Sequence, residues 1–183
     1  DGVAHAAGRP FMVIATQNPI EQAGTYRLPE AQLDRFLVKT SVGYPDRVAL
    51  RRVLAGSARP DRSRSLGAVI ASSAVASMAD LAAGNHVEDS VLDYVGALVE
   101  ATRGDASVRL GVSTRGAIAM VRVARVWAAA QGRAYVVPDD VKDLARSVWA
   151  HRVVMDPDAE FAGASPEQVI DHALTTVPAP THR

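Results

Sequence analysis

Asn18, Arg35 and Arg115 are the residues whose types and positions could handle a phosphate group. Asn18 follows the apolar run 11–15, which is typical of a strand buried on both faces. Doubly wound sheets place ligand-handling groups at such strand ends, and an amide there could orient an attacking water. The alternative is that Asn18 only forms an Asn-Pro turn with Pro19.

Arg35 lies at the end of the segment LPEAQLDRF, in which Pro29 and Glu30 favour the start of a short helix. A guanidinium at this position could stabilise phosphoryl transfer on a neighbouring molecule, as arginine fingers do. The alternative is a surface arginine that pairs with Asp34 or Glu30.

Arg115 stands in the first turn of a predicted helix that Ser113 caps. The positive end of the helix dipole disfavours a cation there by roughly 0.3–1 kcal/mol. Unpaired helix N–H groups beside a guanidinium would suit an anion. The alternative is a solvated arginine that tolerates a small penalty. Arg109, in a predicted loop, has no such geometry.

Other chemistries lack their residues. Lys39 followed by Thr40 matches the last two residues of a phosphate-binding loop. Such a loop has glycines at the positions that Leu33 and Val38 occupy here. No apolar run ends in adjacent Asp and Glu, the acids that usually hold Mg²⁺ and activate water. We therefore expect that the chain alone does not hydrolyse a nucleotide. The five histidines are dispersed, which argues against a metal site.

Composition narrows the class of protein. Hydrophobic residues make up 48% of the 183 residues and aromatic residues only 5%, which favours packed helices. The 20 basic and 20 acidic residues balance, which argues against a nucleic-acid binder. The absence of cysteine favours the cytoplasm, and no apolar run reaches the roughly 18 residues needed to span a membrane. Without an initiator Met, the chain is expected to be an excised piece.

The elements that must position these residues fall into two groups. Strands are predicted at 11–15 and 36–42, with a short helix at 29–36 between them. Residues 43–45 (Gly-Tyr-Pro) mark a domain boundary. Helices are then predicted at 46–55, 68–83, 87–103, 114–131 and 138–151 and from 165, with a polar loop at 59–65 and a brief strand at 134–137. One face of the 87–103 helix carries apolar residues at helical spacing: Val91, Val95, Leu98, Val99 and Thr102.

Together these pieces resemble the MoxR family of AAA+ ATPases. The matching text is ATQNPIEQAGTYRLPEAQLDRF, SVGYP, GVSTRGAIAMVRVAR, YVVPDDVKDLA and AHRV, in order, between residues 10 and 153. The resemblance implies a mostly α chain: the C-terminal end of a AAA+ α/β core at 1–43, an all-helical lid at 44–177 and a loose tail at 178–183. It also implies that Asn18 is the sensor 1 residue, Arg35 the arginine finger and Arg115 the sensor 2 residue.

The resemblance extends to cofactors and partners. The parent protein would bind ATP and Mg²⁺ between subunits of a ring, expected to be a hexamer, whereas this chain would hold neither tightly. Its output would be chaperone-like remodelling or metal-cofactor insertion in partner proteins, often ones with von Willebrand factor A domains. No nucleic acid and no membrane insertion are expected.

The chain departs from the family pattern in two respects. The Walker A and Walker B segments are not present, and Arg27 stands where the family usually has Pro. An apolar lid face is also expected to promote self-association.

Two alternatives of other classes stay open. One is a helical interaction module without a nucleotide role, and the other is a DNA-binding domain that uses the Ser113 helix for recognition. Zero net charge and the presence of only two lysines disfavour the second.

Overall fold

The computed structural model describes residues 2–17, 29–56 and 66–181, and it is mostly α-helical, as the sequence predicts. The elements are, in chain order, α1 (Glu30–Leu33), α2 (Arg47–Gly56), α3 (Ser72–Ala83), α4 (Asp89–Gly104), β1 (Val108–Leu110), α5 (Thr114–Ala130), α6 (Pro138–Trp149), the 3₁₀ turn η3 (Ala150–Arg152), β2 (Val154–Met155), α7 (Pro157–Phe161) and α8 (Pro166–Thr176). Asn18 and the predicted loop 59–65 lie outside the described residues.

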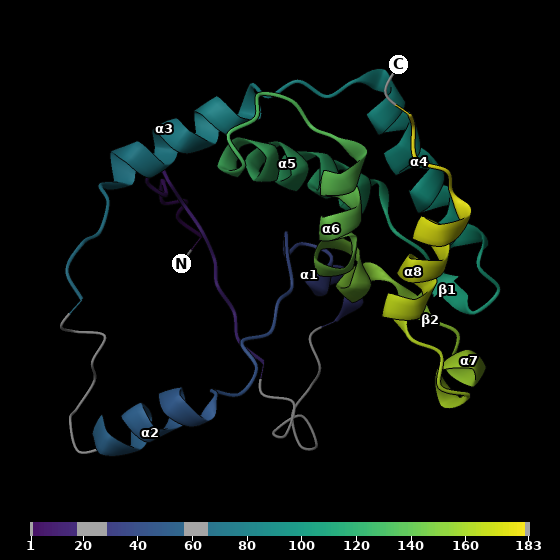
Figure 1. Ribbon diagram of the computed structural model, residues 1–183, viewed down its shortest axis with the longest axis horizontal. Helices are drawn as coiled ribbons and strands as arrows, with labels where there is room; N and C mark the ends of the chain where they lie inside the picture. The colour runs from purple at the N-terminus through teal and green to yellow at the C-terminus, as the bar shows by residue number, and fades with distance from the viewer. Residues whose placement is uncertain (1, 18–28, 57–65, 182–183) are drawn as a thin grey trace.

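The core lies between α4, α5, α6 and α8, which pack together at one end of the molecule (Figure 1). The predicted face of α4 is confirmed, because all five of its residues are buried. Burial of this face against three other helices removes its apolar surface from water, which is the main stabilising contribution to such a fold.

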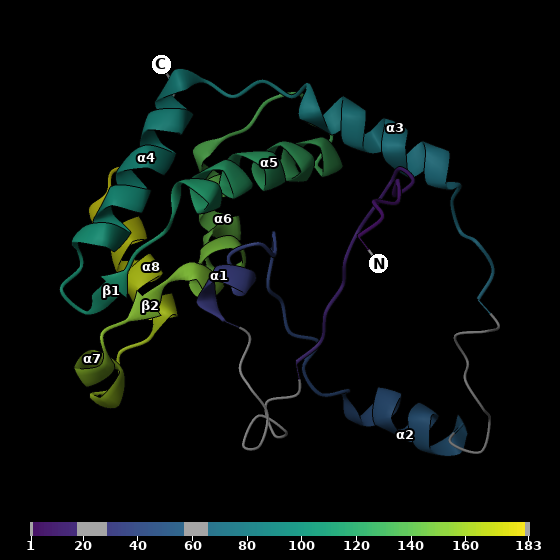
Figure 2. The same cartoon turned by 180° about the vertical axis from the view of Figure 1, so that it is seen from behind.

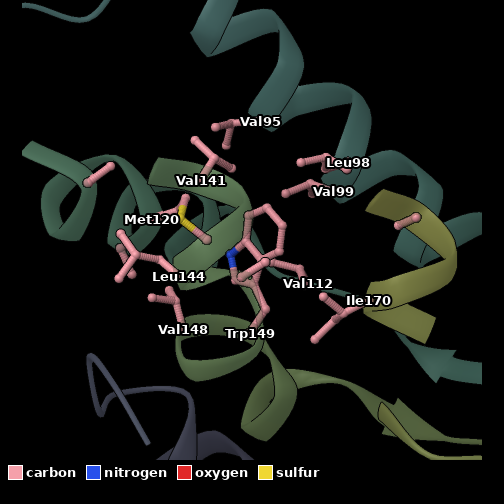
Figure 3. Close-up of a cluster of buried hydrophobic side chains, with 14 of the residues drawn as sticks. Val95, Leu98, Val99, Val112, Met120, Val141, Leu144, Val148, Trp149 and Ile170 are labelled. Atoms are coloured by element: carbon pink, nitrogen blue, oxygen red, sulfur yellow. The ribbon is translucent and has the colours of Figure 1, made fainter. Parts of the chain in front are cut away.

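Trp149 is the largest fully buried side chain (Figure 3). It lies among side chains of α4, α5 and α8, including Leu98, Met120 and Ile170. Its indole Nε1–H donates a hydrogen bond to the backbone oxygen of Gly116, 3.0 Å away. The buried indole N–H is thus satisfied by the first turn of α5, which ties that turn to the end of α6.

A two-stranded antiparallel sheet pairs β1 with β2, in the register Val108 to Met155 and Leu110 to Val154. The sequence analysis did not predict it, because strands of two and three residues show no periodicity. The sheet fixes the segment that enters α5 beside the segment that leaves α6. The strand predicted at 134–137 is reduced to one parallel bridge between His86 and Tyr135.

The two strands predicted near the N-terminus are wrong. Residues 11–15 have no regular secondary structure, and Phe11 and Ile14 are 72% and 80% exposed. A strand needs neighbours for its N–H and C=O groups, and in the described part of the chain no backbone group bonds to residues 11–17. Residues 36–42 are also not a strand. They have one backbone bond to α6 instead, in which the Lys39 N–H donates to the Ser147 oxygen at 2.9 Å.

Helix α2 matches the prediction at 46–55 but lies apart from the packed helices in both views (Figures 1 and 2), and none of its residues is buried. Helix α3 begins at Ser72, four residues later than predicted, and contacts α5. The Asn85 side-chain amide fixes this contact by donating to the backbone oxygens of Arg125 and Arg133, each at 3.0 Å.

The last helix has the capping box that the sequence predicts: Ser165 and Gln168 each accept from the other's backbone N–H. Helix α7 was not predicted. Residues 178–181 have no regular secondary structure, although Ala179 packs against the core. Within the described ranges, no helix combines the length and the apolar character that a membrane crossing needs.

Candidate functional site

Two of the three predicted site residues lie on elements that meet. Arg35 is in the turn that follows α1, and Arg115 is the second residue of α5. The third, Asn18, falls outside the described residues. The site is therefore built from the turn after α1, the start of α5 and the 3₁₀ turn η3 that follows α6.

The loop before α5 is held from two sides. The buried hydroxyl of Thr102 accepts from the Val112 N–H at 3.1 Å, and the Arg103 Nε donates to the Val112 oxygen at 2.9 Å. Gly111 passes so close to Arg103 that a Cβ there would lie 2.8 Å from its backbone. The residue before Ser113 is thus fixed on α4, and a side chain at position 111 would not fit.

Ser113 caps α5 as predicted, since its Oγ accepts from the Gly116 N–H at 3.1 Å. Arg115 in the same turn is exposed, and its guanidinium has no ion-pair or hydrogen-bond partner among the described residues. The remaining first-turn N–H groups have no acceptor within the helix. Among the described residues, a cation without a partner thus stands beside N–H groups without an acceptor, an arrangement that suits a phosphate.

The acids next to Arg35 are occupied by other arginines. Asp34 pairs with Arg152 at 2.7 Å, and Glu30 pairs with Arg109 at 2.8 Å. The alternative that Arg35 pairs with Asp34 or Glu30 is therefore wrong. Its guanidinium is exposed and has no partner within the described ranges.

Arg152 is the buried charge of this region, with a side chain that is 1% exposed. Its guanidinium donates to the Asp34 carboxylate at 2.7 Å and to the Asp34 backbone oxygen. It also donates to the backbone oxygens of Phe36 at 2.6 Å, Leu37 at 3.4 Å and Val148 at 2.8 Å. A buried guanidinium is tolerated only with an opposite charge and further acceptors, and this one has both.

One carboxylate joins this pair to the start of α5. The Ser113 Oγ lies 3.1 Å and 3.3 Å from the two carboxylate oxygens of Asp34 and donates to them. The negative charge of Asp34 near the helix N-terminus is compensated by Arg152. Within the ranges that the structure describes, Arg115 therefore remains a cation without a compensating charge at this end of α5.

His151 contacts the same turn. Its Nε2 lies 3.1 Å from the Phe36 backbone oxygen, which can only accept, so Nε2 carries the proton. Burial lowers the pKa of His151, and the charges of Arg152 and Lys39 lower it further. His151 is accordingly a neutral donor to the turn that carries Arg35.

The sequence analysis missed Arg152, although AHRV was among its matching segments. The available signal in the sequence was an arginine placed between two large apolar residues, Trp149 and Val153. Both of these residues are buried in the structure. The predicted loop at Arg109 is also wrong, because Arg109 is the middle residue of β1.

Acidic residues do not gather into a metal site in the described ranges. No group of three or more His, Asp or Glu side chains there could hold an ion. Ligands for Mg²⁺ are therefore not assigned within the part of the chain that the structure describes.

Comparison with known proteins agrees with this architecture. Residues 100–173 match the AAA lid domain, and residues 1–38 match the ATPase family associated with various cellular activities (AAA). The chain is 38% identical to the uncharacterized protein YeaC of Bacillus subtilis. That match covers 100% of this chain and 57% of YeaC. It is 38% identical to the chaperone MoxR1 of Mycobacterium tuberculosis and 33% identical to the protein MoxR of Paracoccus denitrificans. Each of these two matches covers 93% of this chain. The first covers 47% of MoxR1 and the second covers 56% of MoxR.

Among solved structures, a candidate ATPase from Cytophaga hutchinsonii superimposes with a TM-score of 0.86 at 33% identity. The match covers 97% of this chain and 56% of that one. The chain thus spans about half the length of the curated relatives it matches.

Proposed function

This chain belongs to the MoxR family of AAA+ ATPases and corresponds to the C-terminal portion of its members. From that premise we propose that the chain senses nucleotide and that it completes the active site of a neighbouring subunit. Members of this family use ATP with Mg²⁺. In this proposal, residues 1–43 are the end of the ATPase core, 44–177 are the lid and 178–183 are a tail.

Arg35 is the proposed arginine finger. The observation that carries this role is an exposed guanidinium whose neighbouring acid is held by a buried arginine. Such a cation stays available to a phosphate from another molecule, since nothing in the described part of the chain neutralises it. In related GTPase systems a trans-acting arginine contributes roughly 10³–10⁵ in rate.

Arg115 is the proposed sensor 2 residue. It lies beside the unpaired N–H groups of the first turn of α5, an arrangement that suits the phosphates of ATP. Because α5 belongs to the lid, a contact between Arg115 and nucleotide would make the lid position depend on the nucleotide state. Asn18 is proposed as sensor 1 on the family resemblance alone.

Hydrolysis itself is proposed to need segments of the full-length protein beyond this chain. When bound there, ATP supplies the phosphoryl group and Mg²⁺ neutralises its charge. The residues of this chain orient and sense that group. The chain alone is accordingly proposed to be inactive, since its sequence contains no phosphate-binding loop.

The assembly and the partners are further parts of the proposal. A finger that acts in trans requires a ring, for which a hexamer is the family expectation. The output is chaperone-like remodelling or metal-cofactor insertion in proteins with von Willebrand factor A domains, in the cytoplasm. The relative named chaperone MoxR1 supports the first of these outputs.

The experiment that tests the proposal measures ATP turnover by the full-length protein as a function of its concentration. If each site needs an arginine from another copy, turnover per subunit rises as sedimentation shows rings to assemble. Turnover per subunit that stays constant from monomer to ring contradicts the proposal.

A second arm tests Arg115. Arg115→Ala is expected to lower kcat/KM for ATP about tenfold or more, because a charge-assisted hydrogen bond is lost. Arg122→Ala, which removes an exposed arginine from the same helix, serves as the control and is expected to leave turnover unchanged.

A further inference from the structure

The turn that carries Arg35 is held on both sides of that residue by one buried side chain. The Arg152 guanidinium donates to the carboxylate and backbone oxygen of Asp34, and to the backbone oxygen of Phe36 at 2.6 Å. Arg35 itself projects from between these two anchored residues and is exposed. The backbone that determines where its guanidinium can reach is therefore fixed by Arg152.

The strength of this attachment follows from burial. The Arg152 side chain is 1% exposed, so its charge has little contact with water. Its only described ion-pair partner is Asp34, whose side chain is itself only 24% exposed. Moving the turn away would leave a buried charge without its partner, which is strongly unfavourable.

The same carboxylate receives the cap of α5. The Ser113 Oγ donates to Asp34 at 3.1 Å and accepts from the Gly116 N–H at 3.1 Å. At Gly116 a Cβ would lie 3.1 Å from the Cδ of Arg152, so the first turn of α5 packs directly on the arginine stem. A shift of this turn must therefore displace Asp34, Arg152 or both.

We propose that Arg152 is a positioning residue for Arg35 that acts through Asp34, and that Ser113 makes the position of Arg35 follow the first turn of α5. This inference rests on the proposed roles of Arg35 and Arg115. The two arginines sit on one hydrogen-bonded unit, although each is proposed to act at a different nucleotide site. A displacement of Arg115 by nucleotide at one site would thus be passed to Arg35 at the next.

The expected signature is a loss of kcat without a loss of nucleotide affinity. Misplacing a catalytic group by about 1 Å can cost roughly 100-fold in rate. Asp34→Asn keeps the shape of the side chain but removes its charge, so it loosens the turn and allows the Arg35 guanidinium to move, while Arg35 itself is not mutated. We expect kcat of the full-length protein to fall about 10- to 100-fold, with nucleotide affinity and ring assembly retained.

The experiment compares Asp34→Asn, Arg35→Ala and the double variant in the full-length protein. Because Asp34 acts through Arg35, the double variant is expected to have the kcat of Arg35→Ala alone. Asp171→Asn is the matched control, since it breaks an exposed carboxylate pair with Arg146 on the lid surface. It is expected to leave kcat unchanged.

Ser113 provides a second test that does not disturb the buried charge. Ser113→Ala is expected to lower kcat, and Ser113→Thr, which keeps a hydroxyl that can cap the helix and donate to Asp34, is expected to restore it. If thermal unfolding shows that Asp34→Asn fails to fold, the two Ser113 variants test the positioning of Arg35 in its place.

The outcomes separate this inference from the proposed function. If Arg35→Ala abolishes turnover but Asp34→Asn and Ser113→Ala keep wild-type kcat, the positioning inference is overturned and the proposed role of Arg35 survives. Additive losses in the double variant also overturn it, because Asp34 would then act independently of Arg35. If Arg35→Ala itself keeps turnover, the proposed function fails first.

Discussion

The Nη1 atom of Arg152 lies 2.7 Å from the Oδ1 atom of Asp34, although 118 positions separate the two residues in the chain. This pair attaches the turn after α1 to η3, the 3₁₀ turn that follows α6. The turn that carries Arg35 precedes the domain boundary proposed at residue 43, but its hydrogen bonds join it to Arg152, which lies after that boundary.

Removing the buried arginine should destabilise the chain. Arg152→Ala deprives the Asp34 carboxylate of its partner and loses the packing of the arginine stem on Gly116. We expect the free energy of unfolding, measured by urea denaturation, to fall by about 3 kcal/mol or more.

An exposed pair provides the control. Arg146→Ala breaks a bidentate pair with Asp171, in which the arginine side chain is 63% exposed. Exposed pairs contribute about 0–1 kcal/mol, so this variant should change little. Equal losses from Arg152→Ala and Arg146→Ala would contradict the importance of burial.

Two glycines in helices should respond to alanine in opposite directions. At Gly116 a Cβ would lie 2.7 Å from Val112 Cγ1 and 3.1 Å from Arg152 Cδ, so Gly116→Ala should destabilise by about 1–3 kcal/mol. Gly96 in α4 has no atom within 4 Å of that position, and Gly96→Ala should stabilise by about 0.5–1 kcal/mol. The two midpoints of thermal unfolding, compared with wild type, check the signs. A rise of the midpoint in Gly116→Ala would show that the close approach there is not a constraint, and a fall in Gly96→Ala would contradict the open space at that position.

His151 should make stability depend on pH. Burial lowers its pKa in the folded chain, so the unfolded chain binds the proton more readily. The free energy of unfolding should therefore be highest above the unfolded pKa of about 6.5 and should fall as the pH drops through the folded pKa. Urea unfolding at a series of pH values from 8 to 5 measures this. His151→Gln keeps an amide donor for the Phe36 oxygen but does not titrate, and it should flatten the fall. An identical pH dependence in both proteins would contradict this role.

The helices of the lid could be predicted from local signals. The apolar face of α4, the Ser113 cap and the capping box at Ser165 each depend on residues within a few positions of one another. The strand at 11–15 could not be judged in this way. Its apolar run indicates burial, but a strand also needs partners, and none lies beside it in the described residues.

The roles of Arg35 and Arg115 stay predictions. They follow from helix-end chemistry and from the family resemblance, and the structure shows only that the elements that carry the two residues meet. The link between Asp34 and Arg152 could not be predicted, because no periodicity relates residues 118 positions apart. For the same reason, the sequence analysis could keep a pair of Arg35 with Asp34 or Glu30 as its alternative.

The most direct test of the account is ATP turnover at saturating nucleotide by the full-length protein with Arg35→Ala. The account predicts that kcat collapses by about 10³-fold or more, while nucleotide affinity and ring assembly match wild type. Arg51→Ala, which removes an exposed arginine on α2, should leave kcat unchanged. Wild-type kcat in Arg35→Ala would contradict the account, because Arg35 would then have no part in phosphoryl transfer.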